Sequence, residues 1–218
     1  MRPATGRARQ YPSKVARRTM AEISADDVRR LREQTGGKMM DCKNALVESG
    51  GSIDKAVELL RKKGLASAEK KAGREAKEGR VYAYIHHTQK VGTMVEVDCE
   101  TDFVARNETS QAFVKELAMH ITAGKAEFVN AEQVPADVLE RERRIARESD
   151  AVKGKPAQVV DKIAEGKIAA YLKERVLLQQ PWIHDDAKTV EQVVKELIAK
   201  VGENVVVRRF ARFEIGGA

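Results

Sequence analysis

Apolar residues recur every three or four positions through residues 24–64, a period that predicts three short helices. The first should begin at Ser24, which forms a capping-box pattern with the acid three positions on, and should end at Gly36. The second is expected from about Asp41, and the third is expected to end at Gly64. Together they predict a compact unit of about 40 residues, which is marginally stable by itself.

The hydrophobic period changes from helical to alternating after this unit. Alternation predicts a strand over residues 81–86 and an antiparallel partner over residues 94–99. A β-branched and aromatic run at Asn204–Ile215 predicts a third strand. The segments between are predicted to be helical: 109–123, 138–147, 157–179 and 189–201. The expected fold class is α+β, with a helical N-terminal unit followed by a small antiparallel sheet covered by helices.

Charge is distributed unevenly along the 218-residue chain. We expect a basic extension at residues 1–19, a three-helix domain at 20–65, a linker at 66–79 and an α+β core at 80–218. The net charge is +7, but the extension alone holds six basic side chains and no acid. The remainder has 34 basic and 33 acidic side chains, a net charge of +1. Because counterion release needs clustered positive charge, no direct nucleic-acid binding by the folded part is expected.

The basic extension leaves three interpretations open: an arm that contacts nucleic acid, an organellar transit peptide, or residues added by an upstream start codon. The third is favoured, because a helix start follows Met20 at once. No apolar run approaches the roughly 20 residues that span a bilayer, and no secretory signal is visible. We therefore expect a cytoplasmic protein, or one of an organellar matrix or stroma if the extension is a transit peptide.

The motifs of common catalytic and nucleotide-binding sites are missing from the sequence: GxxxxGK[ST], GxGxxG after a strand, GxSxG, HExxH and paired CxxC. We therefore expect no enzyme, with no catalytic residue, cofactor site or metal site. His86 and His87 alternate on a strand, so they point to opposite faces and cannot share a metal ion. His120 and His184 are expected at the surface or at an interface.

Four acidic side chains are expected to share one face of the second strand: Glu96, Asp98, Glu100 and Asp102. Neighbours two positions apart on a strand point in parallel and do not converge on one ion, so a solvated or arginine-paired face is favoured over a metal site. Arg208 and Arg212 are the expected partners if the third strand joins the sheet. Cys42 and Cys99 occupy apolar positions and are expected in the core.

Two features are typical of a partner-binding surface. Phe103, one of only ten aromatic residues, lies among polar residues where the second strand gives way to a helix. Such a ring is either a plug of the core or an anchor for a partner, and the sequence favours neither. Met39 and Met40 follow a glycine turn and cannot both face inward, so one should present soft apolar surface.

Five segments carry a resemblance to a known family: LREQTGGKMMDCKNALVESGGSIDKAVELLRKKG (31–64), KKAGREAKEG (70–79), VEVDCETDFVARNETS (95–110), KERVLLQQPWIHD (173–185) and VGENVVVRRFARFEIGG (201–217). In this order they resemble translation elongation factor Ts, from Met20 to Gly217. Two departures occur: Gly37–Lys38 replace the usual Ala–Gly or Ala–Pro, and Trp182 replaces the usual Phe.

The resemblance implies a guanine-nucleotide exchange factor for the GTPase elongation factor Tu, with no cofactor of its own. It assigns the disturbance of the partner's Mg²⁺ site to four residues in sequence: Asp102, Phe103, Val104 and Ala105. It also implies that the three-helix unit is similar to a ubiquitin-associated domain. On that unit, Leu31, Met39 and Met40 would contact a helix of the partner.

The length resembles the short form of the family, since the chain reaches its last strand without a second TDFV-bearing half. The resemblance then implies a homodimer formed by the core. An edge left open by so small a sheet is consistent with such pairing. The competing interpretation is an RNA- or ribosome-associated adaptor that uses the basic extension and the three-helix unit.

Overall fold

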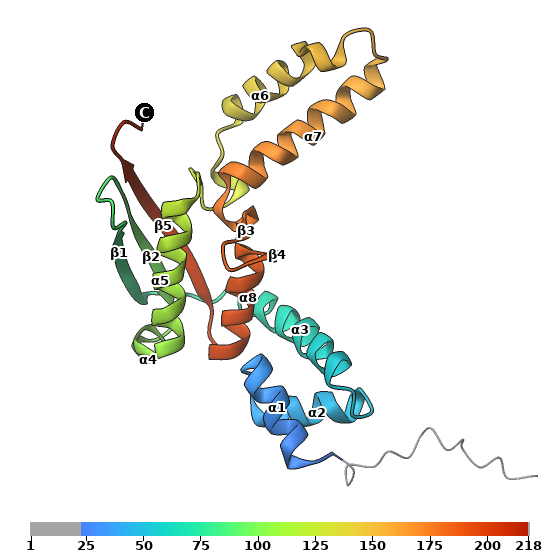
Figure 1. Cartoon of the computed structure of the whole chain (residues 1–218), viewed down its shortest axis with the longest axis vertical. Coiled ribbons are helices and arrows are strands. Elements are labelled where there is room, and N and C mark those ends of the chain that lie inside the picture. Colours follow the sequence, from blue (N-terminus) through green and yellow to red (C-terminus); the bar gives the residue numbers. More distant parts are fainter. Residues whose placement is uncertain (1–22, 218) are drawn as a thin grey trace, which may run out of the picture. The chain divides into compact units, whose positions relative to one another are not determined.

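The computed structural model describes residues 23–217 and divides into two compact units, with the boundary between Lys63 and Gly64 (Figure 1). The expectations for residues 1–19 lie outside the described residues. The elements follow in this order: α1 (Ala25–Thr35), α2 (Met39–Glu48), α3 (Ile53–Glu69), β1 (Glu78–Ile85), β2 (Val91–Cys99), α4 (Asp102–Arg106), α5 (Glu108–Ala123), η3 (Ala131–Gln133), α6 (Ala136–Glu148), η4 (Asp150–Val152), α7 (Ala157–Arg175), η5 (Leu177–Gln179), β3 (Pro181–Trp182), β4 (Asp185–Thr189), α8 (Val190–Val201) and β5 (Val205–Glu214). The predicted α+β class is confirmed.

The smaller unit is built from α1, α2 and most of α3 around one buried cluster. Ser24 caps α1 as predicted: the Asp27 amide donates to Ser24 Oγ at 3.0 Å. Gly36 ends the helix in the left-handed conformation, with φ 65°. The fully buried side chains of this cluster come from all three helices: Leu31, Cys42, Ala45, Leu46 and Ala56.

Two predicted helix limits in this region are wrong. α2 starts at Met39 rather than near Asp41, so both methionines belong to its first turn. α3 runs through Gly64 to Glu69. A glycine ends a helix when it turns left-handed, and Gly64 has no positive φ. A Cβ at Gly64 would lie 3.2 Å from the Cβ of Ala199, so the glycine permits close packing of α3 instead.

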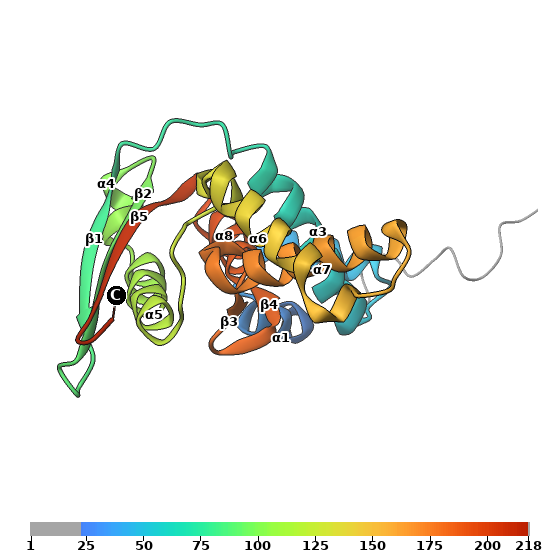
Figure 2. The ribbon, with the colours of Figure 1, turned by 90° about the horizontal axis from the view of Figure 1, so that it is seen from above.

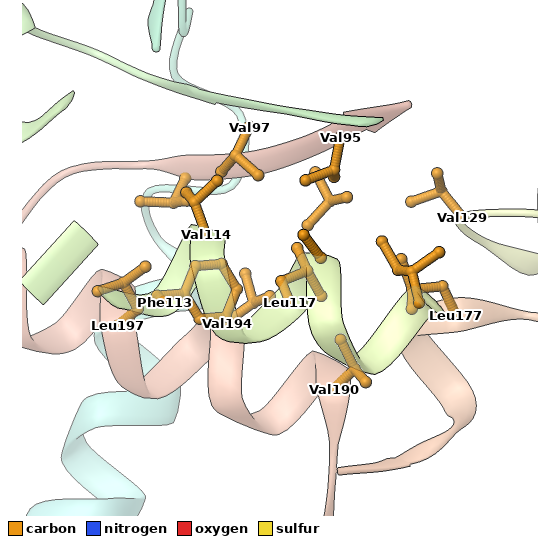
Figure 3. Close-up of a cluster of buried hydrophobic side chains, with 14 of the residues drawn as sticks. Val95, Val97, Phe113, Val114, Leu117, Val129, Leu177, Val190, Val194 and Leu197 are labelled. Atoms are coloured by element: carbon orange, nitrogen blue, oxygen red, sulfur yellow. The ribbon is translucent and has the colours of Figure 1, made fainter. Parts of the chain in front are cut away.

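The larger unit packs three layers: a sheet, then α5, then α8. The sheet is antiparallel throughout, in the order β1-β2-β5. Figure 3 shows Val95 and Val97 of β2 pointing toward α5, while Phe113 of α5 points toward α8. Because α5 lies between two apolar layers, it carries eight buried residues, and its position fixes the strand-to-helix junction that precedes it.

The pairing of β2 with β5 corrects the predicted arginine partners. A β-bulge places Glu96 opposite Arg209 and leaves Arg208 as the extra residue. Arg208 donates to Asp98 at 2.6 Å and Arg209 donates to Glu96 at 2.5 Å, so the arginine-paired face is confirmed for Arg208, whereas Arg209 takes the place predicted for Arg212. Arg212 lies on the opposite face because one extra residue reverses the alternation.

The acidic row is also shorter than predicted. β2 ends at Cys99, so only Glu96 and Asp98 of the four acids lie on the sheet. Asp102 begins α4, and Glu100 accepts a hydrogen bond from the Asn204 amide at 2.6 Å. Among residues 23–217, no group of histidine, cysteine and acidic side chains is placed to hold a metal ion.

A short two-stranded ribbon, β3 with β4, was missed from the sequence. It covers His120 of α5, which is buried, whereas the sequence predicted a position at the surface or at an interface. The His120 ring stacks on Trp182 with centroids 5.2 Å apart. Burial lowers the pKa of His120, and nearby His184 lowers it further, against an opposing hydrogen bond to Gln180. His184 is exposed, as predicted.

The segment between α5 and β3 folds as a hairpin of two helices, α6 and α7 (Figure 1). Ion pairs link the two helices, Arg143 with Glu165 at 3.2 Å and Arg147 with Asp161 at 2.9 Å. Within the described part of the chain, no helix is both long enough and apolar enough to cross a membrane.

Candidate functional site

The junction between β2 and α5 holds the short helix α4, which presents Phe103 to solvent. The Phe103 side chain is 89% exposed, whereas Ala105, two residues on, is 7% exposed and belongs to the core cluster. The choice left open by the sequence is therefore decided: Phe103 is not a plug of the core. An exposed phenylalanine forgoes about 1.5–3 kcal/mol that burial would supply, which makes it a candidate anchor for a partner.

The four residues assigned by resemblance divide into two pairs. Asp102 and Phe103 are exposed, and the Asp102 carboxylate accepts from Arg106 Nε at 3.0 Å, one turn along α4. Val104 is half-buried and packs against the core cluster, beside the buried Ala105. The side chains of the first pair are exposed, whereas the Ala105 side chain holds α4 on the core.

Residues distant in sequence fix the N-terminal end of α4. Both carboxylate oxygens of Glu203 accept from Thr101, its amide at 3.0 Å and its hydroxyl at 2.7 Å. Asn204 donates its side-chain amide to the carbonyl of Arg74 at 2.8 Å. These residues could not be found from the sequence, because 102 positions separate Thr101 from Glu203 and no local pattern connects them.

The C-terminal end of α4 is fixed by local capping. Asn107 Oδ1 accepts from the Thr109 amide at 2.8 Å and so caps α5. Gln111 reaches back from α5, and its side-chain amide donates to the carbonyl of Arg106 at 2.7 Å. Phe103 therefore stands on a helix that is held at both ends.

A second exposed apolar site lies on the three-helix unit. Met39 and Met40 are 59% and 62% exposed in the first turn of α2, so both methionines, and not just one, present their side chains to solvent. Leu31, assigned to the same surface, is 0% exposed and lies inside the cluster of this unit. Leu31 therefore serves the core of this unit, and its part in partner binding stays a prediction.

A third surface is the outer face of the sheet, opposite α5. In Figure 2, α5 lies on one face of the sheet, and no element of residues 64–217 covers the other. The side chains of Tyr82 and Tyr84 turn toward the covered face and pack against the core. Five large apolar side chains of the sheet and the residue after it are exposed instead: Val81, Ile85, Met94, Phe213 and Ile215. We call this set the outer sheet face.

Exposed apolar side chains on fixed elements, in an α+β chain of two units, are the features of a partner-binding protein. Comparison with known proteins gives the particular family. The family described as elongation factor TS matches residues 13–216. The chain belongs to the elongation factor Ts family, and it is thus a translation elongation factor.

Individual relatives are similar over nearly their whole length. Elongation factor Ts of Caldanaerobacter subterraneus subsp. tengcongensis is 54% identical over 194 residues, which cover 89% of this chain and 97% of that protein. Elongation factor Ts of Desulforamulus reducens is 55% identical over 197 residues, 90% of this chain and 91% of the relative. Elongation factor Ts of Fervidobacterium nodosum is 51% identical over 195 residues, 89% of this chain and 99% of the relative.

Proposed function

We propose that this chain is a guanine-nucleotide exchange factor that binds elongation factor Tu and promotes GDP release by disturbing the Mg²⁺ and phosphate site of that GTPase. The observation that carries the proposal is the 89% exposure of Phe103 on a helix fixed at both ends. A ring held in one place and left in water can enter a pocket of a partner at little further entropic cost. Membership of the elongation factor Ts family supports this partner.

In the proposed mechanism, the Phe103 ring wedges into the GTPase domain and Asp102 supplies a polar contact beside it. Met39 and Met40 of the three-helix domain (20–65) bind a helix of the same partner. The factor binds the nucleotide-free GTPase more tightly than the GDP form. By linkage, bound factor lowers the affinity of the GTPase for GDP, and bound GDP lowers its affinity for the factor by the same ratio. No bond is made or broken, so the protein acts without being an enzyme.

We further propose that the chain forms a homodimer through the core (80–218), with the outer sheet face as the contact. The cross-strand neighbours Ala83, Met94 and Ala211 form one apolar row across the face. Isolated apolar side chains on a surface are ordinary, whereas several that gather on one face of a sheet mark an interface. The ion pairs Asp98–Arg208 and Glu96–Arg209 lie beside them on the same face. The relatives named above are bacterial proteins, which supports the bacterial cytoplasm as the place of action.

Release of a fluorescent GDP analogue from purified elongation factor Tu, followed by stopped flow, tests the exchange proposal. The wild-type chain should accelerate release, and Phe103→Ala should lose most of the acceleration. Ile145→Ala is the control, since Ile145 is also exposed and apolar but lies on α6. A wild-type chain that leaves the release rate unchanged would overturn the proposed function.

A further inference from the structure

Glu203 makes a long-range polar contact to the exposed junction, across 102 positions of the chain. Glu203 lies between α8 and β5, yet its two carboxylate oxygens accept hydrogen bonds from the amide and the hydroxyl of Thr101. The lengths are 3.0 Å to the amide and 2.7 Å to the hydroxyl. Hydrogen bonds to an ionised carboxylate are about twice as strong as neutral ones, so this is a firm attachment.

The attachment replaces the usual helix cap. Thr101 is the N-cap residue of α4 and has an extended backbone, but its side chain makes no capping bond to the helix. A threonine at this position normally accepts a hydrogen bond from an amide in the first turn. Here its hydroxyl donates to Glu203 instead. The side chain of Thr101 therefore fixes α4 to a distant loop.

α4 depends on such an attachment because it has only five residues. A helix of that length is unstable in water, so its direction is set by the contacts at its ends and by the side chains that pack beneath it. Ala105 provides the packing beneath, and the Thr101–Glu203 contact sets the N-terminal end. Phe103 lies two residues after Thr101, so movement of this end moves the ring.

The next residue reinforces the same loop. Asn204 is buried, its backbone amide donates to Glu100 Oε1 at 2.6 Å, and its side-chain amide donates to the carbonyl of Arg74 at 2.8 Å. Arg74 also lies 3.5 Å from the Glu100 carboxylate. Glu203 thus follows the position of Asn204, which is fixed by its own hydrogen bonds. Its carboxylate is therefore a fixed point of attachment for α4.

We propose that Glu203 is a positioning residue for nucleotide exchange, acting through Thr101 to hold α4 so that Phe103 is presented in one orientation. The inference rests on the proposed exchange function. It predicts a specific defect: a factor without this carboxylate still binds the GTPase through its other surfaces, but it releases GDP slowly once bound.

The test measures the GDP-release rate from elongation factor Tu against factor concentration for wild type, Glu203→Ala and Glu203→Gln. Glu203→Ala should lower the saturating rate about tenfold, since a hydrogen-bonded charged partner is lost. The half-saturating concentration should change less than about threefold, because remote contacts persist. Glu203→Gln should recover most of the rate, because its amide can accept from the Thr101 amide and donate to the hydroxyl.

Glu165→Ala is the matched control, since it removes an exposed glutamate that pairs with Arg143 on the α6–α7 hairpin. It should retain the wild-type saturating rate. Thr101→Val is the second variant, because it removes only the hydroxyl and keeps the shape of the side chain. It should show a smaller defect of the same kind, and it decides the question if Glu203→Ala does not fold.

Amide hydrogen exchange gives a readout independent of activity. Amides of residues 101–106 should exchange faster in Glu203→Ala, while those of α5 and β2 remain protected. Wild-type rates and wild-type protection in Glu203→Ala would overturn the positioning role while leaving the exchange function intact. If instead the wild-type chain does not accelerate GDP release, the exchange function itself fails and this inference fails with it.

Discussion

The rings of His120 and Trp182 stack with their centroids 5.2 Å apart and their planes inclined by 17°, which joins α5 to the β3–β4 ribbon. The contact is polar as well as apolar. The Ile183 amide donates to His120 Nδ1 at 3.3 Å, so the neutral ring carries its proton on Nε2 and donates it to Gln180 Oε1 at 2.9 Å. Every polar atom of the buried ring is satisfied only in the neutral form.

This geometry predicts that the free energy of unfolding decreases as the pH is lowered below about 6.5, the ordinary pKa of histidine. Burial lowers the pKa of His120 in the folded chain, so the unfolded chain binds the proton more readily. The free energy of unfolding should be constant with respect to this group above pH 7 and should decrease as the pH falls through the folded pKa. Urea unfolding at several pH values between 8 and 5 measures the slope.

The matched pair of variants is His120→Gln and His184→Gln. The first removes the buried titrating group and should flatten the acid slope attributable to it, at the cost of a less stable protein at pH 7. The second removes an exposed histidine and should leave most of the slope in place. A His120→Gln chain with the wild-type slope would show that other groups cause the acid sensitivity.

Self-association gives the second prediction. At micromolar concentration the chain should sediment near twice its 24.2 kDa mass. Met94→Glu places a carboxylate in the middle strand of the outer sheet face, where a second copy would have to desolvate it, so this variant should be monomeric. Its stability should change by about 0.5 kcal/mol or less, because Met94 is exposed.

Ile145→Glu serves as the control, since it introduces the same charge at an exposed apolar position of α6. It should remain dimeric. A wild-type chain that is monomeric at every accessible concentration would contradict the homodimer, although it would leave the exchange function untouched.

The sequence predicted those parts of the fold that depend on neighbouring residues. The cap at Ser24 and the left-handed stop at Gly36 involve residues within one helical turn, so the pattern alone locates them. The first two strands of the sheet followed from alternation and the third from its β-branched and aromatic residues, and the junction around Phe103 followed from the change of period. The resemblance covered nearly the whole chain and located the same junction independently.

Features that depend on distant residues were not predictable in this way. The extra residue Arg208 reverses the faces of the strand after it, and nothing local distinguishes it from Arg209. The burial of His120 requires a ribbon formed about 60 residues later, as the separation of its hydrogen bond to Gln180 shows. Leu31 occupies a helical position that a sequence pattern assigns equally well to a core or to an interface.

The third prediction compares Leu31 and Met40, because one lies in the core of the three-helix unit and the other lies on its proposed contact surface. Leu31→Ala removes a fully buried side chain and should destabilise the three-helix unit by about 2–5 kcal/mol. Met40→Ala should leave its stability nearly unchanged and should raise the half-saturating concentration for GDP release. Thermal unfolding with exchange titrations of both variants checks this, and a Met40→Ala titration identical to wild type would remove the methionine from the proposed surface.

The last prediction compares two phenylalanines ten positions apart. Phe113 is buried against Trp182, with ring centroids 6.3 Å apart, so Phe113→Ala should cost about 3–5 kcal/mol of stability. Phe103→Ala should cost about 1 kcal/mol or less, since the ring is exposed. If Phe103 enters the partner, its loss should slow GDP release about thirtyfold, the effect of an interface aromatic worth roughly 2 kcal/mol. Asp102→Ala should slow release less, because an exposed carboxylate contributes a hydrogen bond rather than buried area. Thermal unfolding and GDP release measured on the same three variants decide the assignment: a stable Phe103→Ala chain that exchanges nucleotide at the wild-type rate would exclude the wedge.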